Sequence, residues 1–596
     1  MHALRKTLCV LLQLTAFAAF QLPLQPADSV SDWDQVEARV RVEADTCTVE
    51  DSDPHPQPNR VLLNGNESFT IEKYHDENLY KISALNHRQL DVAIQELCGA
   101  RFLQPLGKSW RQDQDINLDE AEVFKIIDSG PSENRIDVVF MGDGYASHER
   151  ARFLQDMNRL ATDMWKGDTF RSVTPFVNVW AVYVPSVDSG ILRVLGYPTA
   201  LNPGIGTNGR AKNTPFGLYR DGTELRGVYC SKRRAARAAC RKTGPKACDY
   251  PSLIGNDDFY GGLGGEFTIT TRSILSGTVV LRHEMGHNFI SVGEEYDGGQ
   301  VYSGVNAARS LQDIHWEHWL TEPGKLKEEK QALILQQYPW VDLAKGVKRY
   351  SFTSRGVFPR WTMKISASGV ESNNSLQVYL DGVQLDWKPR GDLDRSFYSW
   401  DSEAPFSKGI HTLEFKGLPP STPSSPIRQI CSVEIHEFEN APRFHENNTF
   451  ISAYPTFDMY GRKTYRPTNE GCLMRDMLST SFCSVCQEGL WLRFLERVDL
   501  IDGLNVTQNG DSTFFQLELI ALAHLRPKLE QVSGESYAIS WFQENEELME
   551  LRNVTDFSRD SSQAVGAWKV LVKFSTPEIR KDSKGLTSSS RDFVVT

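Results

Sequence analysis

The sequence predicts a multidomain protein that combines an α/β layer with several all-β modules. The chain has 596 residues, more than one hydrophobic core usually supports, so we expect about two to four domains. Compact apolar runs on either side of a helix-like segment indicate buried strands of an α/β layer. Short strands separated by Gly, Pro, Asn and Ser indicate all-β modules elsewhere in the chain.

The first 20 residues have the pattern of a targeting segment. A short basic region with Arg5 and Lys6 precedes an apolar run from Thr7 to Phe20, which is too short to span a bilayer. We interpret residues 1–20 as a signal peptide. No later stretch is apolar enough to cross a membrane, so we expect a secreted, extracellular protein without a membrane span.

The α/β layer is predicted to begin after an N-terminal domain. Residues 21–125 mix alternating strand-like runs with a helix-like stretch at 86–98 and indicate a mixed or β domain. A buried-strand pattern follows at 136–141, then a helix near 147–165 and a second strand at 176–184. We assign residues 126–345 to the first part of the α/β domain.

Two further modules are predicted to be all-β. Residues 346–440 read as an inserted β-sandwich, and residues 441–504 return to the α/β domain. Residues 505–596 read as a C-terminal β-sandwich, whose polar tail from Thr576 is expected to be poorly ordered. The strands expected in these modules are 361–365, 376–380, 412–415, 432–438, 514–519, 537–541 and 568–574.

Charge and cysteine usage narrow the class of partner and the compartment. The net charge of −12 and the pI near 5.7 argue against nucleic acid or an anionic membrane as partners. If Cys9 leaves with the signal peptide, an odd number of cysteines remains, and an oxidising compartment favours several disulfides with one thiol left over. Acceptor patterns for N-glycosylation occur at Asn66, Asn373, Asn447, Asn505 and Asn553.

The segment Gly277 to Tyr296 contains the motif H-E-x-x-H. Residues four apart share one face of a helix, so His283 and His287 can direct two imidazoles at a single tetrahedral zinc ion. Glu284 lies beside them and is placed to take a proton from a water that the metal acidifies, and then to pass it to a leaving amine. An apolar stripe at Leu281, Met285, Phe289 and Val292 faces about 200° away, at about 100° of rotation per residue.

A catalytic zinc ion normally takes a third protein ligand. The nearest candidates are Glu294 and Glu295, which follow Gly293, a residue that could end the helix and turn the chain back toward the metal. We favour Glu294. Glu295 is the alternative ligand, or else a hydrogen-bond partner of a histidine ring. Tyr296 or Tyr302 could donate to an oxyanion, although a packed tyrosine explains each equally well.

Four segments together resemble one known family. Arg135 to Tyr145, Thr214 to Gly217, the H-E-x-x-H segment with its Glu-Glu-Tyr ending, and Cys472 to Arg475 are similar to the IgA-peptidase family of zinc metalloendopeptidases. The resemblance covers roughly residues 130–345 and 440–495. It implies a metzincin-like α/β catalytic domain, zinc held by the motif histidines and a downstream acidic residue, Glu284 as general base, and a methionine turn at Met474. It also suggests a fungal source.

This sequence departs from the family at one position. The usual segment ends Asp-Glu-Tyr, whereas here it reads Glu294, Glu295, Tyr296, and a Glu is one methylene longer than an Asp. The resemblance does not imply immunoglobulin A as the substrate, because that cleavage belongs to particular members.

Two cysteine-rich segments have open interpretations. Cys483 and Cys486 with Cys472 could bind a second metal, but the expected secretion favours disulfides. A basic run lies among Cys230, Cys240 and Cys248. We interpret it as a solvated loop stapled by disulfides, with a role in substrate binding or processing as the alternative.

The sequence thus predicts a secreted metalloendopeptidase with one catalytic Zn²⁺ and a protein or peptide substrate. The alternative is a secreted protein that binds carbohydrate or protein and retains the metallopeptidase fold without catalysis. The intact motif argues against it, because a scaffold has no need of Glu284 beside two ligands. The sequence makes no prediction of the oligomeric state.

Overall fold

The computed structural model describes residues 118–596, apart from short gaps, together with six N-terminal strands. The gaps are 166, 194–211, 221–223, 300–301, 418–426 and 459–460. The predicted signal peptide at 1–20, the helix-like stretch at 86–98 and the acceptor Asn66 lie outside the described residues. In the described part of the chain, no helix has the length and apolarity needed to cross a membrane.

The N-terminal strands form a compact unit of their own, with one mixed sheet in the order β3-β4-β5-β1-β2-β6. Strand β1 is antiparallel to β2 and β5, and β2 is parallel to β6. The strands are β1 (Val36–Val42), β2 (Thr46–Glu50), β3 (Arg60–Gly65), β4 (Phe69–Tyr74), β5 (Leu79–Ala84) and β6 (Phe102–Gln104).

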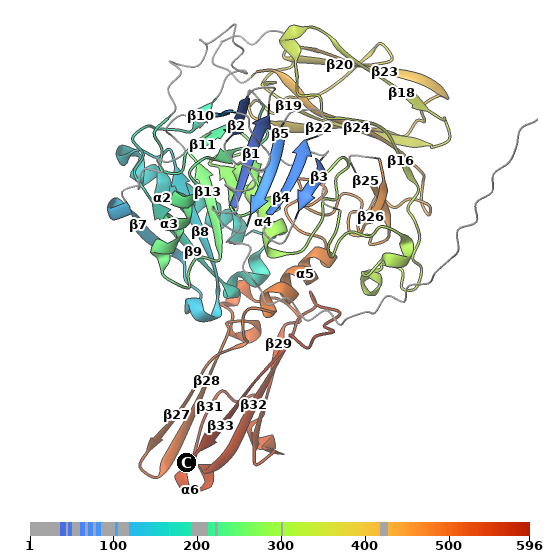
Figure 1. Cartoon of the computed structure of the whole chain (residues 1–596). Coiled ribbons are helices and arrows are strands. Elements are labelled where there is room, and N and C mark those ends of the chain that lie inside the picture. The colour runs from blue at the N-terminus through green and yellow to red at the C-terminus, as the bar shows by residue number, and fades with distance from the viewer. Residues whose placement is uncertain are drawn as a thin grey trace, which may run out of the picture. The chain divides into compact units, whose positions relative to one another are not determined.

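The second unit contains a six-stranded sheet in the order β14-β15-β13-β8-β9-β7 (Figure 1). Its central strands β15, β13, β8 and β9 are parallel, and the edge strands β14 and β7 are antiparallel to their neighbours. The strands are β7 (Glu122–Ile127), β8 (Ile136–Asp143), β9 (Val177–Tyr183), β13 (Tyr250–Gly255), β14 (Gly262–Leu263) and β15 (Thr268–Thr271). The expected α/β layer is therefore present.

Helices cover both faces of this sheet because β8 is apolar on both sides. Val138 and Phe140 pack with the apolar sides of α2 (Arg150–Trp165) and α4 (Gly277–Phe289). Val139 and Met141 pack on the opposite face, in a core that includes α3 (Arg233–Cys240). Helix α2 starts three residues later than predicted, because Ser147–Glu149 forms a 3₁₀ turn before it.

Asp143 fixes a loop at the carboxyl end of β8. Its buried carboxylate accepts hydrogen bonds from the hydroxyl of Thr214 and from the backbone N–H groups of Phe216 and Leu218. These three donors offset the cost of burying the carboxylate. The loop leads into a small sheet of β10 (Leu192–Arg193), β11 (Leu218–Arg220) and β12 (Tyr229–Cys230).

The inserted module consists of two sheets around a core of its own. Its first strand is β16, so the module begins before residue 346. One sheet has the order β16-β24-β19-β22, with β17 also paired to β24, and the other has the order β18-β23-β20-β21. The strands are β16 (Gln331–Gln337), β17 (Val341–Asp342), β18 (Lys348–Ser354), β19 (Arg360–Ser368), β20 (Leu376–Leu380), β21 (Val383–Leu385), β22 (Ser396–Ser402), β23 (Gly409–Gly417) and β24 (Gln429–Phe438).

The chain then returns to the α/β domain and ends in a second sandwich. Strands β25 (Tyr454–Phe457) and β26 (Lys463–Arg466) pair, and α5 (Ser484–Leu495) follows. The C-terminal sheets have the orders β27-β28-β31 and β30-β29-β32-β33, and a short helix, α6 (Ser561–Ala564), precedes β32. These strands are β27 (Ile501–Asn509), β28 (Ser512–Leu519), β29 (Ser536–Gln543), β30 (Glu546–Glu547), β31 (Asp556–Asp560), β32 (Gly566–Ser575) and β33 (Ser588–Val595).

The C-terminal tail corrects one prediction. It was expected to be poorly ordered from Thr576, yet Ser588–Val595 forms β33, which pairs with β32 along its length. Phe593 and Val595 also pack against the core. The polar composition hid this strand, because backbone hydrogen bonds to a neighbouring strand do not depend on apolar side chains.

Candidate metal centre

Helix α4 carries the H-E-x-x-H motif and is anchored by its opposite face. Leu281, Met285 and Phe289 are fully buried in the core beneath it. The helix ends at Phe289, where Ile290 adopts an extended conformation. This differs from the prediction that Gly293 ends the helix: the β-branched Ile290 disfavours further helix, and the chain has already left it three residues before the glycine.

The structure brings His283, His287 and Glu294 together. The Nε2 atom of His283 lies 3.3 Å from Oε2 of Glu294, and Nε2 of His287 lies 3.2 Å from its Oε1. One ligand atom from each of the three residues lies within 4.8 Å of the others. The ring planes of the histidines are nearly perpendicular, at 81°. Two imidazoles and a carboxylate therefore face one point.

Backbone carbonyls select the tautomer of both histidines. Nδ1 of His283 lies 3.2 Å from the carbonyl of Leu473, and Nδ1 of His287 lies 3.1 Å from that of Val292. A carbonyl can only accept, so each Nδ1 must carry the hydrogen. In a neutral ring, Nε2 then keeps its lone pair, which is the form that binds a metal.

The charges of this group depend on one another. Burial would lower the pKa of His287, but hydrogen bonding and the charge of Glu294 raise it to about 9. Burial would raise the pKa of Glu294, yet the two histidines hold it well below its ordinary value. The carboxylate of Glu294 is therefore held in its charged form, which is the form that binds a cation.

The donor set fits a divalent metal ion. Oε2 of Glu294 is buried and accepts no hydrogen bond from the described residues, although it is 3.3 Å from Nε2 of His283. A buried carboxylate oxygen without a partner is costly unless a cation satisfies it. Imidazole nitrogen and carboxylate oxygen are also the ligands of catalytic zinc sites that keep a position open.

Glu284 stands beside these ligands against a glycine rim. A Cβ atom on Gly264 would lie 2.7 Å from Oε2 of Glu284, so the carboxylate occupies the space that a side chain would fill there. Burial raises the pKa of Glu284. Among the described residues, no donor forms a hydrogen bond with it, which leaves the carboxylate able to bind water or substrate.

Glu295 points away from the motif histidines. Its Oε1 accepts a hydrogen bond from Asn306 at 2.8 Å and lies 3.7 Å from Sγ of Cys486. The two histidine Nδ1 atoms have carbonyl partners instead, so neither role considered for Glu295 at the motif matches its position. Adjacent residues in this extended loop face opposite sides, and Glu294 takes the side of the histidines.

The proposed oxyanion donors have different surroundings. Tyr302 donates to the carbonyl of Tyr296 at 2.5 Å and accepts from the N–H of Gly299, so its hydroxyl holds the loop together. The ring of Tyr296 lies 6.3 Å from the ring of His283, between centroids. Only Tyr296 therefore remains close to the histidines as a candidate donor.

Several residues that support the loop were missed in the sequence. Asn306 bonds both the N–H and the carbonyl of Gly293, at 2.7 and 2.9 Å. Asp297 accepts from His436 and from Arg475, each at 2.9 Å, and all three side chains are buried. These partners lie up to 178 residues apart and belong to no motif. The acidic run from Glu294 to Asp297 was the one available signal.

The methionine expected beneath the metal lies under α4. Met474 is fully buried, and its sulfur would be 3.1 Å from a Cβ atom on Gly286, so that glycine permits the close approach. The carbonyl of Met474 accepts from the N–H of Glu295 at 3.0 Å. The turn therefore contacts both the motif helix and the loop that carries Glu294.

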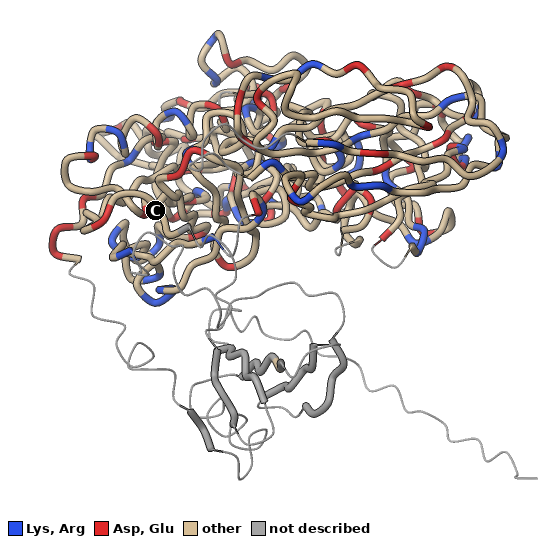
Figure 2. Tube along the Cα trace, turned by 90° about the horizontal axis from the view of Figure 1, so that it is seen from above, with Lys and Arg blue, Asp and Glu red and all other residues tan. Residues whose placement is uncertain are grey.

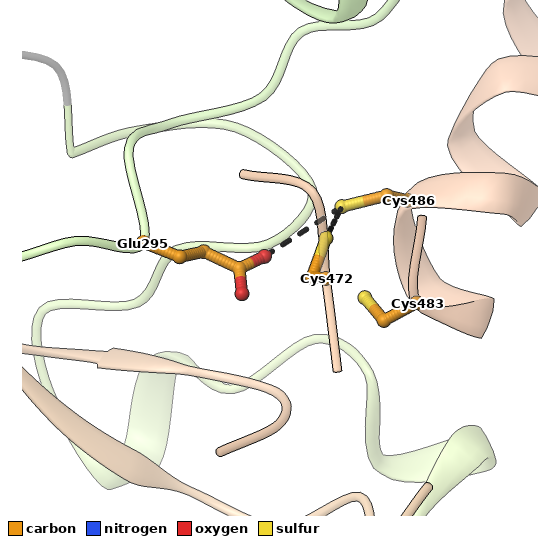
Figure 3. A group of neighbouring side chains, drawn as sticks. All are labelled: Glu295, Cys472, Cys483 and Cys486. Carbon is orange, nitrogen blue, oxygen red and sulfur yellow. Dashed lines mark hydrogen bonds between the residues drawn. The ribbon is translucent and has the colours of Figure 1, made fainter. Parts of the chain in front are cut away.

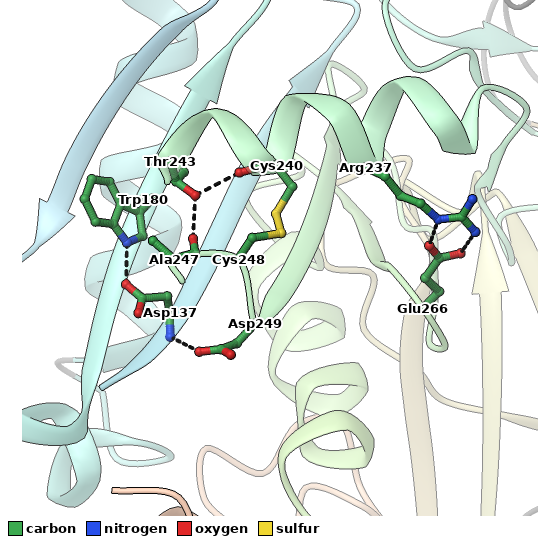
Figure 4. The surroundings of a disulfide bond; sticks show 9 residues. All are labelled: Asp137, Trp180, Arg237, Cys240, Thr243, Ala247, Cys248, Asp249 and Glu266. Atoms are coloured by element: carbon green, nitrogen blue, oxygen red, sulfur yellow. Dashed lines mark hydrogen bonds and ion pairs between the residues drawn. A yellow bond between two sulfur atoms is a disulfide. The ribbon is translucent and has the colours of Figure 1, made fainter. Parts of the chain in front are cut away.

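Much of the basic run forms helix α3, whereas the sequence predicted a solvated loop. Arg233 and Arg237 on α3 pair with Glu266, and a disulfide joins Cys240 to Cys248 (Figure 4). It is the one disulfide found within the described residues. Because the carboxylate of Glu266 already binds two of the arginines, the run supports the fold of this layer. Over the described chain, Lys and Arg are interleaved with Asp and Glu (Figure 2).

The arrangement is that of a metal-dependent hydrolase site: three donors converge, and a carboxylate stands beside them. Residues 124–330, roughly a third of the chain, match the family model described as IgA Peptidase M64. The match includes the motif helix, Glu294 and Glu295. It supports the resemblance seen in the sequence, and with it a metallopeptidase that acts on a protein or peptide substrate.

Other comparisons add little. No curated protein matches the chain. Among solved structures, a family 35 carbohydrate-binding module from an environmental isolate has 14% identity over 16% of this chain and 72% of its own, with a TM-score of 0.11. A GH2 β-galacturonidase from Eisenbergiella tayi has 9% identity over 42% of this chain and 35% of its own, with a TM-score of 0.12.

A putative β-galactosidase from Bacteroides fragilis has 11% identity over 42% of this chain and 33% of its own, with a TM-score of 0.11. The chain thus spans about a third of the length of these two enzymes. With TM-scores this low, the similarities have no bearing on the fold or the function.

Proposed function

We propose that this protein is a secreted zinc metalloendopeptidase with His283, His287 and Glu294 as the zinc ligands and Glu284 as the general base. The observation that carries the proposal is the convergence of three ligand atoms within 4.8 Å, with the Nδ1 atoms of both histidines directed to carbonyls. The match to a peptidase family over residues 124–330 supports the same reaction class.

Zinc supplies a Lewis acid that polarises the substrate carbonyl and makes water a better proton donor. Glu284 accepts a proton from the attacking water and returns it to the leaving amine. The carboxylate of Glu284 is suited to both steps, because burial raises its pKa and no described residue donates a hydrogen bond to it. Tyr296 is the remaining candidate for a donor to the oxyanion.

The surroundings of Glu284 suit a polypeptide substrate. Gly264 and Gly265 follow the edge strand β14, and the rim they form has no side chains beside the carboxylate. An extended backbone can therefore approach Glu284 closely at the border of the sheet.

Secretion is part of the proposal. The acceptors Asn373, Asn447, Asn505 and Asn553 are all exposed, as glycosylation requires. The disulfide between Cys240 and Cys248 also suits an oxidising compartment.

The test compares wild type with Glu284→Ala and with Glu317→Ala, a matched change at an exposed glutamate. Metal content and hydrolysis of a denatured protein mixture are measured for each. We expect Glu284→Ala to keep the catalytic zinc and to lose turnover by about 10³-fold or more, because the ligands remain and the base is gone. Glu317→Ala should match wild type.

Equal hydrolysis by Glu284→Ala, or wild-type protein without zinc at the histidines, would overturn the proposal. The secreted binding protein would then be the better reading. A chelator that stops wild-type hydrolysis, followed by recovery with Zn²⁺, is the expected companion result.

A further inference from the structure

A second cluster of metal-ligating side chains lies on the far side of the loop that carries Glu294. It consists of Glu295, Cys472, Cys483 and Cys486, whose ligand atoms all lie within 4.8 Å of one another. Figure 3 shows the four side chains pointing toward a common centre from three separate segments. Their exposed fractions are 0% for Glu295, Cys472 and Cys486, and 5% for Cys483.

The carboxylate of Glu295 has an unsatisfied oxygen at this centre. Oε1 accepts from Asn306, whereas Oε2 is buried without a hydrogen-bond partner. A buried carboxylate oxygen without a partner is unfavourable unless a cation or a donor satisfies it. The thiol of Cys486 approaches Oε1 and not Oε2, and no hydrogen bond to Oε2 is found within the described residues.

We propose that Glu295, Cys472, Cys483 and Cys486 bind a second, structural Zn²⁺ ion. The Sγ atoms of Cys472 and Cys486 are 3.8 Å apart. Two thiolates bound to one tetrahedral zinc at about 2.3 Å are separated by about 3.8 Å. Three sulfurs and one carboxylate oxygen make a closed four-ligand set, and structural zinc sites are closed, whereas catalytic ones keep a position open.

The start of a helix lies beside two of the cysteines. Cys483 is the N-cap residue of α5, and Cys486 lies in its first turn, where the helix dipole stabilises negative charge. Zinc binding would release the thiol protons and leave a net negative group, which the helix dipole partly offsets.

A disulfide explains the cluster less well. Joining any two of the three cysteines would leave the third thiol and the carboxylate of Glu295 buried together without a shared partner. Zinc is the one occupant that uses all four groups.

The second ion would affect the first site by stabilising residues that position its ligands. The N–H of Glu295 donates to the carbonyl of Met474, and the carbonyl of Leu473 orients His283. Both residues lie next to Cys472, and Glu295 is adjacent to Glu294. A metal joining Glu295 to Cys472 would therefore fix the position of Glu294 and the tautomer of His283 together.

The cluster is not accounted for by the family match, which ends at residue 330 and leaves out the three cysteines. The inference also stands apart from the proposed function. It requires only that the four side chains bind a cation, whatever reaction the histidines support.

The experiment measures the metal content and the near-ultraviolet absorption spectrum of the full-length protein. We expect about two zinc ions per chain in wild type, and about one in His283→Ala/His287→Ala, where only the cysteine cluster remains. After exchange with Co²⁺, that double variant should keep a near-ultraviolet sulfur-to-cobalt charge-transfer band. Cys483→Ser should lose the band and one zinc ion, while Cys431→Ser, a buried cysteine of the inserted module, should keep both.

The double histidine variant decides the question even if a cysteine variant does not fold, because it leaves the cluster intact. Absence of metal and of the charge-transfer band in that variant would overturn the inference. So would peptide mapping that finds a disulfide between two of Cys472, Cys483 and Cys486. If the catalytic proposal alone is wrong, wild type should hold about one zinc and still show the band.

Discussion

At the scale of single residues, the position of Glu284 depends on the absence of a side chain at Gly264. Gly264 has backbone angles open to any residue, but its missing Cβ atom leaves the space that the Glu284 carboxylate enters, 2.7 Å from where that atom would stand. The contact is with the tip of a flexible side chain. A larger residue at position 264 would therefore move Glu284 with little effect on the fold.

Gly264→Ala should lower kcat about 10-fold or more and leave the free energy of unfolding nearly unchanged. The methyl group forces the carboxylate of Glu284 away from the position in which it can take a proton, and a small displacement of a catalytic group is costly. Steady-state hydrolysis and urea unfolding measure the two effects.

Gly503→Ala is the matched control, because its Cβ atom would meet Oε2 of Glu518 at 3.1 Å in the C-terminal module. Its kcat should equal that of wild type. A kcat unchanged in Gly264→Ala would show that Glu284 does not need this space.

The H-E-x-x-H motif predicted that His283 and His287 lie close together, because residues four apart share one face of a helix. The choice between Glu294 and Glu295 needed the structure, since a loop has no period that says which side chain faces the helix. The partners of Glu295 confirm this limit: Cys472 and Cys486 lie more than 170 residues away, and no spacing rule joins them to it.

At the scale of elements, the inserted sandwich has a titratable pair of its own. His411 on β23 is 7% exposed, and its Nδ1 lies 2.6 Å from a carboxylate oxygen of Asp381. Burial lowers the pKa of His411, but its hydrogen bonds with Asp381 and with the carbonyl of Ser407 outweigh burial and raise it. Glu437 acts in the same direction.

This pair should make the inserted module less stable as the pH rises above neutrality. A raised pKa means that the folded state binds the proton more tightly than the unfolded state, whose histidine has the ordinary value of 6.5. The contribution is therefore complete below pH 6.5 and is lost as the pH rises through the raised pKa. Calorimetry of wild type and His411→Gln should show a difference in Tm at about pH 5.5 that shrinks by about pH 9.

His524→Gln, at an exposed histidine of the C-terminal module, should show no such trend. A Tm difference between wild type and His411→Gln that grows with pH would contradict the assignment, because it would mean that the neutral ring is the stabilising form.

Helices and strands with a clear hydrophobic periodicity were predictable from the sequence, whereas the residues at which they end were not. Each strand expected in the two sandwiches is present, because alternating or wholly apolar runs define them well. Helix α4 ends at Phe289 and not at Gly293, and β33 was missed altogether. The end of α4 is set by the extended conformation of Ile290, and β33 is formed by hydrogen bonds to β32.

At the scale of the whole molecule, the C-terminal sandwich and the α/β domain share one hydrophobic core. Trp491 of α5 stacks on Phe574 of β32, with ring centroids 5.3 Å apart, and donates to Glu578. Arg526 donates to the carbonyl of Ser172 at 2.5 Å. The sequence predicted the strands of this module but not these contacts, because pattern and composition do not show which surfaces of two modules are apolar toward each other.

Phe574→Ala should lower the free energy of unfolding by about 3–4 kcal/mol, because it opens a cavity against Trp491 in this shared core. The yield of folded protein should fall with it. Phe514→Ala, at a residue that is 46% exposed on the same module, should have little effect. An equal loss from both changes, measured by urea unfolding, would show that the two domains are stabilised separately.

The hydrogen bond between His283 and Leu473 spans 190 residues, with the inserted sandwich between them. At a synthesis rate of about 5–20 residues per second, the ribosome makes the motif helix about 10–40 seconds before the turn that orients its first histidine. The nascent chain therefore lacks a complete candidate metal site until the insert has emerged.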